Sequence, residues 1–343
     1  MDSVKILENE EYKSLVSPDY NYVFNKKTGF FARWGKTKEE DPKVGLPEIL
    51  DIEITTICDG ATSVGCSACY KSNTTNGINM SFESFQKVIG KLPRSICQLA
   101  FGADATLKSN PDIWKMMEFT RSKGIIPNIT VASVDDETAD NLAKYCGACA
   151  VSRYTNKNHC YDTVKRLTDR GMNQVNIHFV LHDKSFEMAL ETLNDIKNDE
   201  RLSKLNAIVF LSLKTKGRGK NFKIMSNEKF NELIEIAFEM GINFGFDSCS
   251  YHKFEKSIKN KEKFADLIKY AEPCESSLFS TYIDAEGKFF PCSFTPKNDI
   301  WGDDGIDVIN CNNFLEDIWY CDKVSKFREI LLNNERKCPL YNI

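Results

Sequence analysis

The stretch EILDIEITTI, residues 48–57, decides the fold of this chain, because it alternates apolar and polar residues and then leads into Cys58. Alternation with a period of two predicts a half-buried β-strand. From here onward, stretches typical of strands alternate with stretches typical of helices. The further predicted strands cover residues 97–102, 125–133, 148–154, 174–182, 207–213 and 242–250, and the predicted helices cover 81–92, 110–124, 135–147, 160–171, 185–202 and 226–241.

This regular alternation predicts an α/β fold with parallel strands joined by helical crossovers. About six strand–helix units fit between residues 49 and 241, whereas a complete barrel of this type needs eight. The residues alone therefore indicate either an open, partial (β/α)6 barrel or a doubly wound sheet. In both folds ligands bind at the C-terminal ends of the strands, which is where Cys58 falls.

The regions that flank the repeating pattern have a different character. Residues 20–35 read as a β-hairpin, with two aromatic-rich runs around a turn that contains Gly29. Residues 37–48 contain two prolines and read as an exposed linker. We therefore expect an N-terminal hairpin and linker over 1–48, a (β/α)6 core over 49–245 and a small C-terminal α+β extension over 246–343.

Composition excludes several classes of protein. The chain has 343 residues, 42% of them hydrophobic, and a net charge of −4, so no broad basic face for nucleic acid is expected. No apolar run reaches the roughly 18 residues of a membrane span, and the acidic N-terminus does not resemble a signal peptide. We expect a cytoplasmic protein that binds neither nucleic acid nor membrane. In that setting thirteen cysteines point to metal or redox chemistry rather than disulfides.

Three of these cysteines, Cys58, Cys66 and Cys69, are spaced C-x7-C-x2-C directly after the first predicted strand. Structural zinc sites prefer four protein ligands. A [4Fe–4S] cluster takes one ligand per iron, so three thiolates would leave one iron free to bind a substrate or cofactor. A zinc site completed by a distant residue and a loop of free thiols are the alternatives.

The run LDIEITTIC followed by CSAC resembles the first strand and cluster loop of radical SAM enzymes, and the resemblance extends over nearly the whole chain. The usual loop of that family is C-x3-C-x2-C, so this one is four residues longer, with Gly60 and Gly65 available for the extra turn. The resemblance implies a partial (β/α)6 barrel. It also implies that Cys58, Cys66 and Cys69 bind a [4Fe–4S] cluster whose fourth iron is chelated by S-adenosylmethionine (SAM).

The resemblance also suggests residues that contact SAM. The family usually has Gly-Gly-Glu after the second strand, and this chain has Gly102, Ala103 and Asp104 there, of which Asp104 would face the methionine amine. Ser152, after the fourth strand, and Asn176, in the fifth, are further candidates. A simple strand-to-helix turn is the alternative interpretation of residues 102–104. The basic run KGRGK, residues 216–220, is another candidate, although it reads more simply as a surface loop.

The remaining cysteines form two groups. Cys97, Cys146, Cys149 and Cys160 lie within the repeating region, where we expect them to pack as small apolar residues. The others all follow residue 248, a density that packing does not explain; they are Cys249, Cys274, Cys292, Cys311, Cys321 and Cys338. Cys274 and Cys292 flank a predicted hairpin that turns at DAEG, which would bring their two thiols near one metal centre.

The spacing C-x12-G-x4-C of this hairpin resembles the opening of the SPASM and twitch extensions of radical SAM enzymes, which carry auxiliary iron–sulfur clusters. The resemblance implies a second [4Fe–4S] cluster held by Cys274 and Cys292, with Cys249 and Cys338 as the next two ligands. Cys311 is the reserve, and Cys321 is expected to pack inside a helix over 314–332. A zinc site would use the same thiols.

The function that the resemblance implies is reductive cleavage of SAM to a 5′-deoxyadenosyl radical, which removes hydrogen from a substrate. A peptide or protein side chain is the first expectation for that substrate. Only residues 1–48 precede the first barrel strand, too few for a separate peptide-recognition domain, so a small molecule such as a nucleoside or sugar is the second. An electron donor such as flavodoxin or ferredoxin would be required. A non-catalytic zinc or iron–sulfur protein is the alternative from another class.

Overall fold

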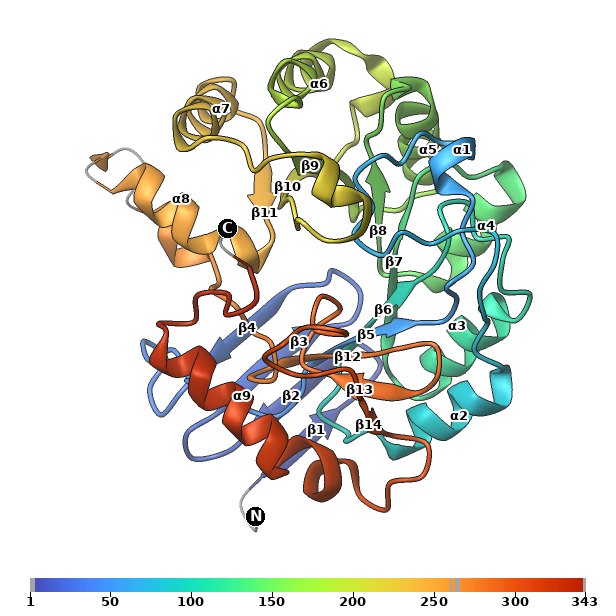
Figure 1. Cartoon of the computed structure of the whole chain (residues 1–343), viewed down its shortest axis with the longest axis vertical. Helices are drawn as coiled ribbons and strands as arrows, with labels where there is room; N and C mark the ends of the chain where they lie inside the picture. Colours follow the sequence, from blue (N-terminus) through green and yellow to red (C-terminus); the bar gives the residue numbers. More distant parts are fainter. Residues whose placement is uncertain (1–3, 260, 263–265, 342–343) are drawn as a thin grey trace.

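A ten-stranded sheet dominates the chain in the computed structural model, which describes residues 4–259, 261–262 and 266–341. Its strand order is β11-β10-β9-β8-β7-β6-β5-β12-β13-β14 (Figure 1). The parallel strands are β5 (Ile49–Glu53), β6 (Gln98–Gly102), β7 (Ile126–Val131), β8 (Ala148–Ser152), β9 (Val175–Leu181), β10 (Ala207–Ser212) and β11 (Phe244–Phe246). The predicted α/β fold, a partial barrel of parallel strands, is confirmed.

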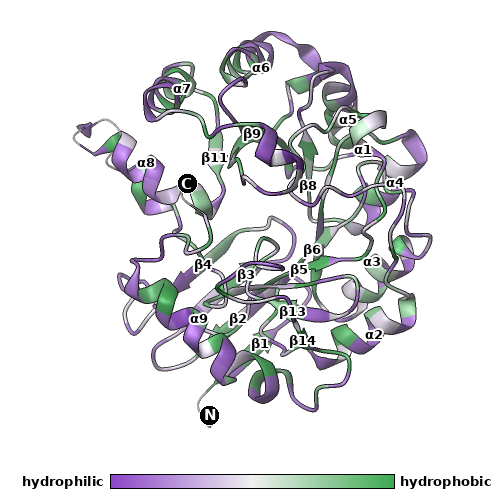
Figure 2. Ribbon diagram, in the orientation of Figure 1, coloured by the Kyte–Doolittle hydropathy of each residue, from purple (hydrophilic) through white to green (hydrophobic). Residues whose placement is uncertain are grey.

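Helices connect these strands and cover the outer side of the curved sheet (Figure 1). They are α2 (Phe82–Lys91), α3 (Ile113–Ser122), α4 (Asp136–Tyr145), α5 (Lys157–Asp169), α6 (Phe186–Asn198) and α7 (Asn227–Glu239). Ser81 caps α2 by accepting a hydrogen bond from the Ser84 amide, and Asp135 caps α4 in the same way from Thr138. Apolar and polar residues occupy different faces of these helices (Figure 2), so each helix packs one face on the sheet.

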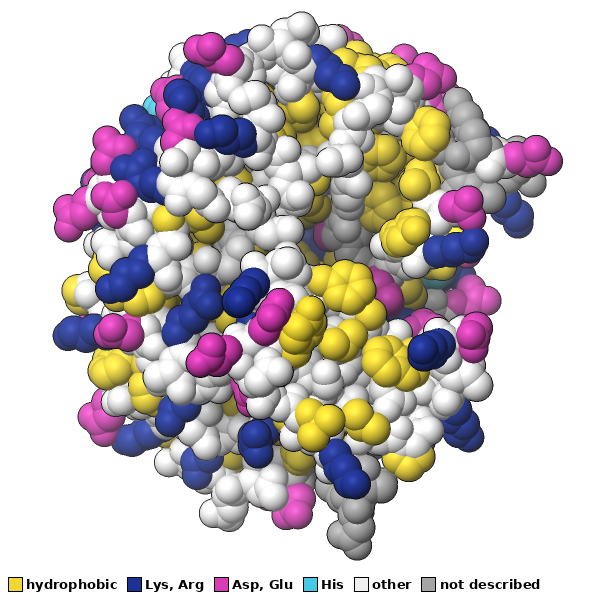
Figure 3. Space-filling view, turned by 180° about the vertical axis from the view of Figure 1, so that it is seen from behind, with side chains coloured by type: hydrophobic (Ala, Val, Ile, Leu, Met, Phe, Trp, Pro, Cys, Tyr) yellow, Lys and Arg dark blue, Asp and Glu magenta, His cyan; other side chains and the backbone are white. Residues whose placement is uncertain are grey.

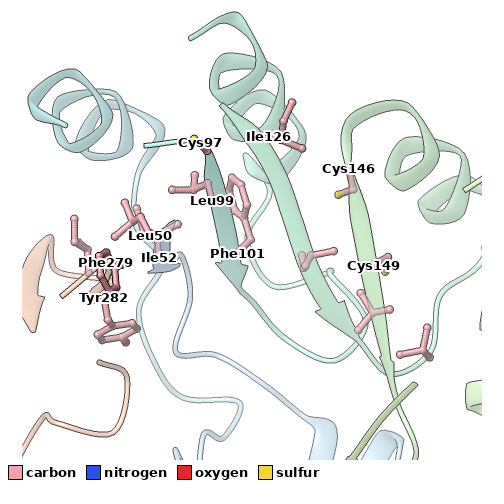
Figure 4. Close-up of a cluster of buried hydrophobic side chains, with 14 of the residues drawn as sticks. Leu50, Ile52, Cys97, Leu99, Phe101, Ile126, Cys146, Cys149, Phe279 and Tyr282 are labelled. Atoms are coloured by element: carbon pink, nitrogen blue, oxygen red, sulfur yellow. The ribbon is translucent and has the colours of Figure 1, made fainter. Parts of the chain in front are cut away.

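The two faces of the sheet carry different residues. Outward-facing side chains such as Leu50, Ile52, Leu99 and Phe101 are buried between sheet and helices (Figure 4). Several of the alternate positions that face the barrel interior are small or polar, namely Ala100, Asn128, Thr130, Ala150, Asn176 and Ala207. Of these, Thr130, Ala150, Asn176 and Ala207 are paired across four strands. Bulky branched residues usually fill the interior of a (β/α)8 barrel. Their absence from these positions leaves room for a ligand.

The N-terminal region is a separate four-stranded antiparallel sheet in the order β1-β2-β3-β4. Its strands are β1 (Lys5–Glu8), β2 (Tyr12–Val16), β3 (Asn21–Asn25) and β4 (Phe31–Trp34). The predicted hairpin is β3 and β4, and β1 and β2 were not predicted. The Lys13 ammonium donates to the carbonyl of Ile96 over 2.9 Å, and the Tyr22 hydroxyl donates to the carbonyl of Ser95 over 2.7 Å. The sheet therefore docks below the N-terminal end of β6.

A buried arginine also ties this small sheet to the rest of the chain. The Arg33 guanidinium, 5% exposed, lies 2.8 Å from Glu48 before β5, and 3.1 Å and 2.9 Å from Glu272 and Glu275. It also stacks on the ring of Phe279, 3.7 Å from the ring centroid. Burial raises the pKa of Glu48 to about 8, although Arg33 and the Tyr20 hydroxyl oppose the shift. One arginine therefore joins the N-terminal sheet, β5 and the C-terminal region.

The C-terminal region contains the predicted hairpin, formed by β12 (Ser280–Ile283) and β13 (Lys288–Phe290), with β14 (Ile306–Asp307) beside β13. Gly287 makes the turn possible, because its φ of 81° is a left-handed conformation. β12 also pairs in parallel with β5. The C-terminal region therefore continues the barrel sheet, and the division of the chain at residues 48 and 245 stays a prediction.

The helix predicted over 314–332 is wrong as a single element. A π-helix, η6 (Phe314–Trp319), ends before Cys321, which then serves as the N-cap position of α9 (Asp322–Asn333). The remaining helical elements are α1 (Gly60–Ser63), η1 (Glu200–Leu202), η2 (Gly217–Asn221), η3 (Ser248–Ser250), α8 (Tyr251–Ile258) and η5 (Leu267–Tyr270). No helix in the described ranges is long and apolar enough to cross a membrane. On the face shown in Figure 3, described basic and acidic side chains are interspersed.

Candidate active site

A cavity of about 700 Å³ opens at the C-terminal ends of the parallel strands. Its wall includes the cysteine loop after β5, the ends of β8 to β10, the segment after β11, and parts of the C-terminal region. The cysteines that line it are Cys66, Cys69, Cys249, Cys274, Cys292 and Cys338. The fold therefore brings thiols from both ends of the sequence to one cavity.

The cysteine loop holds its thiols close to backbone amides. The Gly60 amide donates to the Cys58 sulfur over 3.3 Å, and a Cβ at Gly60 would lie only 3.2 Å from that sulfur. Cys58 is not among the described residues that line the cavity. A hydrogen bond with the Cys66 thiol lowers the pKa of Cys69, and the amides of residues 71–73 act in the same direction. Thiolates are the form that binds metal, so the contacts of Cys69 fit a ligand role. The same hydrogen bond, together with burial, raises the pKa of Cys66.

Tyr154, just after β8, was not predicted as a site residue. Its hydroxyl hydrogen-bonds both the Cys66 thiol and Ser152, and burial raises its pKa. Ser152 itself lines the cavity, as a SAM-contacting residue would. Its assignment stays a prediction.

The other predicted SAM contacts lie elsewhere. Gly102 ends β6 and is exposed, and Ala103 follows it. The Asp104 carboxylate accepts hydrogen bonds from the amides of Thr106, Lys108 and Ser109 at 3.0–3.2 Å. It thus stabilises its own turn, which is the alternative structural role considered for this segment.

Asn176 faces the barrel interior from β9, where its side-chain oxygen accepts a hydrogen bond from Asn206 at 2.8 Å. Gly102, Ala103, Asp104 and Asn176 are not among the described residues that line the cavity. Their assignment as SAM contacts stays a prediction.

The run at 216–220 is not the free surface loop that the sequence indicated. A Cβ at Gly217, whose φ is 55°, would lie 2.4 Å from the carbonyl oxygen of Tyr70. The Arg218 guanidinium donates to the carbonyl of Asn73 over 3.1 Å, and the Lys216 ammonium donates to the carbonyl of Pro296 over 2.7 Å. This loop therefore joins the cysteine loop to the segment that follows Cys292.

The four C-terminal cysteines proposed as ligands lie close enough to influence one another electrostatically. Burial raises the pKa of Cys249 well above its usual value, and Cys274 and Cys338 act in the same direction. Burial also raises the pKa of Cys274 to about 12, with Cys292 and Cys338 contributing. The Lys214 ammonium contacts Cys249 and lies 3.1 Å from Asp247.

The remaining cysteines do not join this group. The charged and titratable neighbours that shift the pKa of Cys311 are Lys91, Asp317 and Asp307, and no thiol is among them. Cys321, between η6 and α9, lies near Arg328. The four cysteines of the barrel lie in the core, where burial raises the pKa of Cys146 and Cys160 to about 12. Such thiols pack as apolar groups, as the sequence predicted.

The spacing of the thiols bears on the kind of metal site. In the described part of the chain, no three His, Cys, Asp or Glu side chains are grouped tightly enough to bind one metal ion. A [4Fe–4S] cluster spreads its ligands over four irons. Neither cysteine set is therefore a ready-made site for a single zinc ion.

Two further polar side chains in the cavity were not predicted. Asp51 projects into it from β5 and His178 from β9, where burial lowers the imidazole pKa to about 4. The sequence did contain an indication of Asp51, because strands that are buried on both faces usually consist of continuous apolar residues. A charged residue inside such a strand therefore indicates a functional interior.

Comparisons with known proteins bear on the fold. No protein-family model matches the sequence, and no curated protein matches it. Among solved structures, Streptococcus suis SuiB bound to S-adenosylmethionine aligns with a TM-score of 0.59 and 17% identity, over 82% of this chain and 66% of that one. The chain thus spans slightly less than two thirds of SuiB.

Two further solved structures align at TM-scores that are too low to support an inference. BtrN in complex with AdoMet and 2-DOIA has a TM-score of 0.44 and 12% identity, over 84% of this chain and 88% of that one. The radical SAM enzyme HemN, the coproporphyrinogen III oxidase of Escherichia coli, has a TM-score of 0.41 and 13% identity, over 57% and 53%. On the SuiB alignment, the chain has the fold of a protein whose structure contains bound S-adenosylmethionine.

Proposed function

We propose that this chain is a radical SAM enzyme in which Cys58, Cys66 and Cys69 hold a [4Fe–4S] cluster that binds SAM. The observation that carries the proposal is the single cavity at the strand ends, which is lined by Cys66 and Cys69 on one side and by four distant cysteines on another. The likeness to SuiB supports the same fold at 17% identity.

The donor set fits such a cluster. Three thiols from one loop leave one iron without a protein ligand, and the hydrogen bond with Cys66 and the amides of residues 71–73 lower the pKa of the Cys69 thiol. When bound, the cluster and SAM supply one-electron cleavage of the sulfonium, which gives a 5′-deoxyadenosyl radical able to remove hydrogen from a substrate.

The chain's own residues shape and close the site around that chemistry. Tyr154 and Ser152 form the wall beside Cys66. Tyr70, adjacent to Cys69, packs on Phe294 with ring centroids 4.5 Å apart, and so joins the cysteine loop to the C-terminal region. Both rings line the cavity, so they place apolar surface beside the site.

The C-terminal cysteines fit a second [4Fe–4S] cluster of the twitch or SPASM type. Cys249, Cys274, Cys292 and Cys338 line one cavity and influence one another's ionisation. The Ser276 and Thr295 hydroxyls lie 3.3 Å and 3.2 Å from the sulfurs of Cys274 and Cys292, where they can donate hydrogen bonds to thiolates. The second cluster would lie on the substrate side of the cavity.

For the substrate, a peptide or protein side chain is the first candidate, and a small molecule such as a nucleoside or sugar is the second. The enzyme would receive electrons from a flavodoxin or ferredoxin and act in the cytoplasm. The test is to assemble the protein without oxygen and measure its iron, its sulfide and the 5′-deoxyadenosine that forms with SAM and a reductant. Two clusters predict about eight irons and eight sulfides per chain. Zinc in place of iron, with no 5′-deoxyadenosine, would favour a non-catalytic zinc protein.

A further inference from the structure

Asp51 lies in the middle of β5, and its side chain faces the cavity. Its neighbours Leu50 and Ile52 are 0% exposed and pack on the outer side of the sheet. Because successive side chains of a strand point to opposite faces, Asp51 points into the barrel. The residue is exposed to the space within the cavity.

This carboxylate has no partner among the described residues. Two carboxylates line the cavity there, and the other one, Asp247, pairs with Lys214 over 3.1 Å. The carboxylates near Asp51 are also paired, Glu53 with Lys71 at 3.2 Å and Glu275 with Arg33 at 2.9 Å. No hydrogen bond or ion pair within the described ranges reaches Asp51. A carboxylate that lines a cavity and has no ion-pair partner is available to a cationic ligand.

The groups around Asp51 determine the pH at which its carboxyl group ionises. Desolvation by the surrounding chain raises the pKa of Asp51 to about 6, Glu275 acts in the same direction, and Lys71 opposes them. The Tyr70 phenol also lies nearby, and His178 in the same cavity is neutral at pH 7. Above pH 6 Asp51 therefore adds a negative charge without an ion-pair partner to this part of the wall.

The location separates Asp51 from the predicted SAM contact at Ser152. β5 lies between β6 and β12, and β12 begins at Ser280 beside the segment that carries Cys274 and Ser276. Ser152 lies three strands away at the end of β8. Asp51 thus belongs to the cavity wall on the side of the C-terminal cysteines.

We propose that Asp51 binds a cationic group of the substrate, an ammonium or guanidinium, at the cavity wall on the side of the C-terminal cysteines. The inference rests on the proposed function and adds the chemical class of the substrate. A carboxylate makes its strongest hydrogen bonds to a charged donor. A lysine or arginine side chain of a peptide and an amino sugar both carry this chemistry.

Two matched pairs of probes distinguish these sources. The first pair is N-acetyl-Ala-Lys-Ala amide and the same peptide with norleucine in place of lysine. The second pair is glucosamine and glucose. Binding to the SAM-loaded, anaerobically assembled protein is measured by calorimetry. We expect the amine-bearing member of one pair to bind about tenfold more tightly than its neutral partner, and the pair that shows the effect identifies the source.

Variants test whether Asp51 causes the preference. Asp51→Asn should remove it, Asp51→Glu should keep at least part of it, and the exposed control Asp19→Asn should leave it unchanged. The preference should strengthen as pH rises from 5 to 7, because Asp51 loses its proton in that range. The Asp51→Glu variant keeps the comparison valid if Asp51→Asn does not fold.

The proposal is wrong if neither amine-bearing probe binds more tightly than its neutral partner, or if the preference persists in Asp51→Asn. It is also wrong if Asp51→Asn weakens the binding of SAM as much as it weakens the binding of the amine probe, because Asp51 would then pair with SAM. Failure of the proposed function looks different, since wild-type protein would then form no 5′-deoxyadenosine. The binding comparison needs no turnover and still reports on Asp51.

Discussion

The backbone amide of Arg218 donates a hydrogen bond of 2.9 Å to the carbonyl oxygen of Cys69. The loop after β10 therefore holds the cysteine loop through main-chain atoms. Gly217 permits this contact, because any side chain there would meet the carbonyl oxygens of Tyr70 and Cys69. The basic run at 216–220 thus acts through its glycines as well as its charges.

Replacing Gly217 with alanine should separate these two loops. We expect Gly217→Ala to destabilise the protein by about 3 kcal/mol, because a left-handed backbone and a collision with Tyr70 add together. The control is Gly241→Ala, which has a similar φ of 61° but open space around its Cβ and should lose only about 1 kcal/mol. Urea unfolding measures both. Equal losses in the two variants would mean that the close contact has no energetic importance.

Replacing Cys58, Cys66 and Cys69 together with alanine should abolish SAM cleavage while about half of the iron remains, because the second set of thiols is intact. The measurements are 5′-deoxyadenosine by chromatography and iron per chain by elemental analysis. Cys160→Ala is the matched control, since this cysteine is buried in the core. Full cleavage activity in the triple variant would contradict the radical SAM proposal.

Cys274→Ala or Cys292→Ala should lower iron per chain by up to about half and destabilise the C-terminal region, because metal binding there is coupled to folding. Cleavage of SAM without substrate should survive in part, since the first cluster is held by the barrel. Cys311→Ala is the control and should leave iron unchanged. If the wild-type protein carries zinc and only about four irons, the second cluster does not exist.

Arg33→Met should destabilise the protein by about 3 kcal/mol, because it leaves Glu48 buried without its cationic partner. Arg94 offers a contrast, since it is 74% exposed and lies 3.7 Å from Glu8. Arg94→Met should cost less than about 1 kcal/mol. Denaturant unfolding of both variants checks the difference. A small loss in Arg33→Met would show that the N-terminal sheet docks without this ion pair.

The sequence predicted the barrel well because each strand and helix of 49–241 carries its own local periodicity. It singled out two cysteine sets because thiols are rare and their spacing is informative, and their assignment as cluster ligands stays a prediction. It did not predict β1 and β2, which are short. Most side chains of β1 are exposed, and those of β2 alternate between buried and more exposed positions. Nor did it predict the contact of Gly217 with Tyr70, because a glycine's role depends on what lies beside it in space.

The prediction of a single helix over 314–332 was wrong for a different reason. Its residues are periodic throughout, but the chain turns at Tyr320 and begins a new helix after Cys321. Local periodicity does not show where a helix must bend to stay on a core. Asp51 was visible as an acidic residue inside a strand, yet its lack of a partner can be seen only once the surrounding chain is placed.

The pairing of β12 with β5 has a consequence for how this protein can be engineered. A chain shortened after β11 would leave β5, the strand that leads into the cysteine loop, with an unprotected hydrogen-bonding edge. Exposed edges of this kind recruit other strands and promote aggregation. The C-terminal part therefore cannot simply be replaced by that of another protein. A chimaera with a foreign C-terminal part must include a strand that pairs with the free edge of β5.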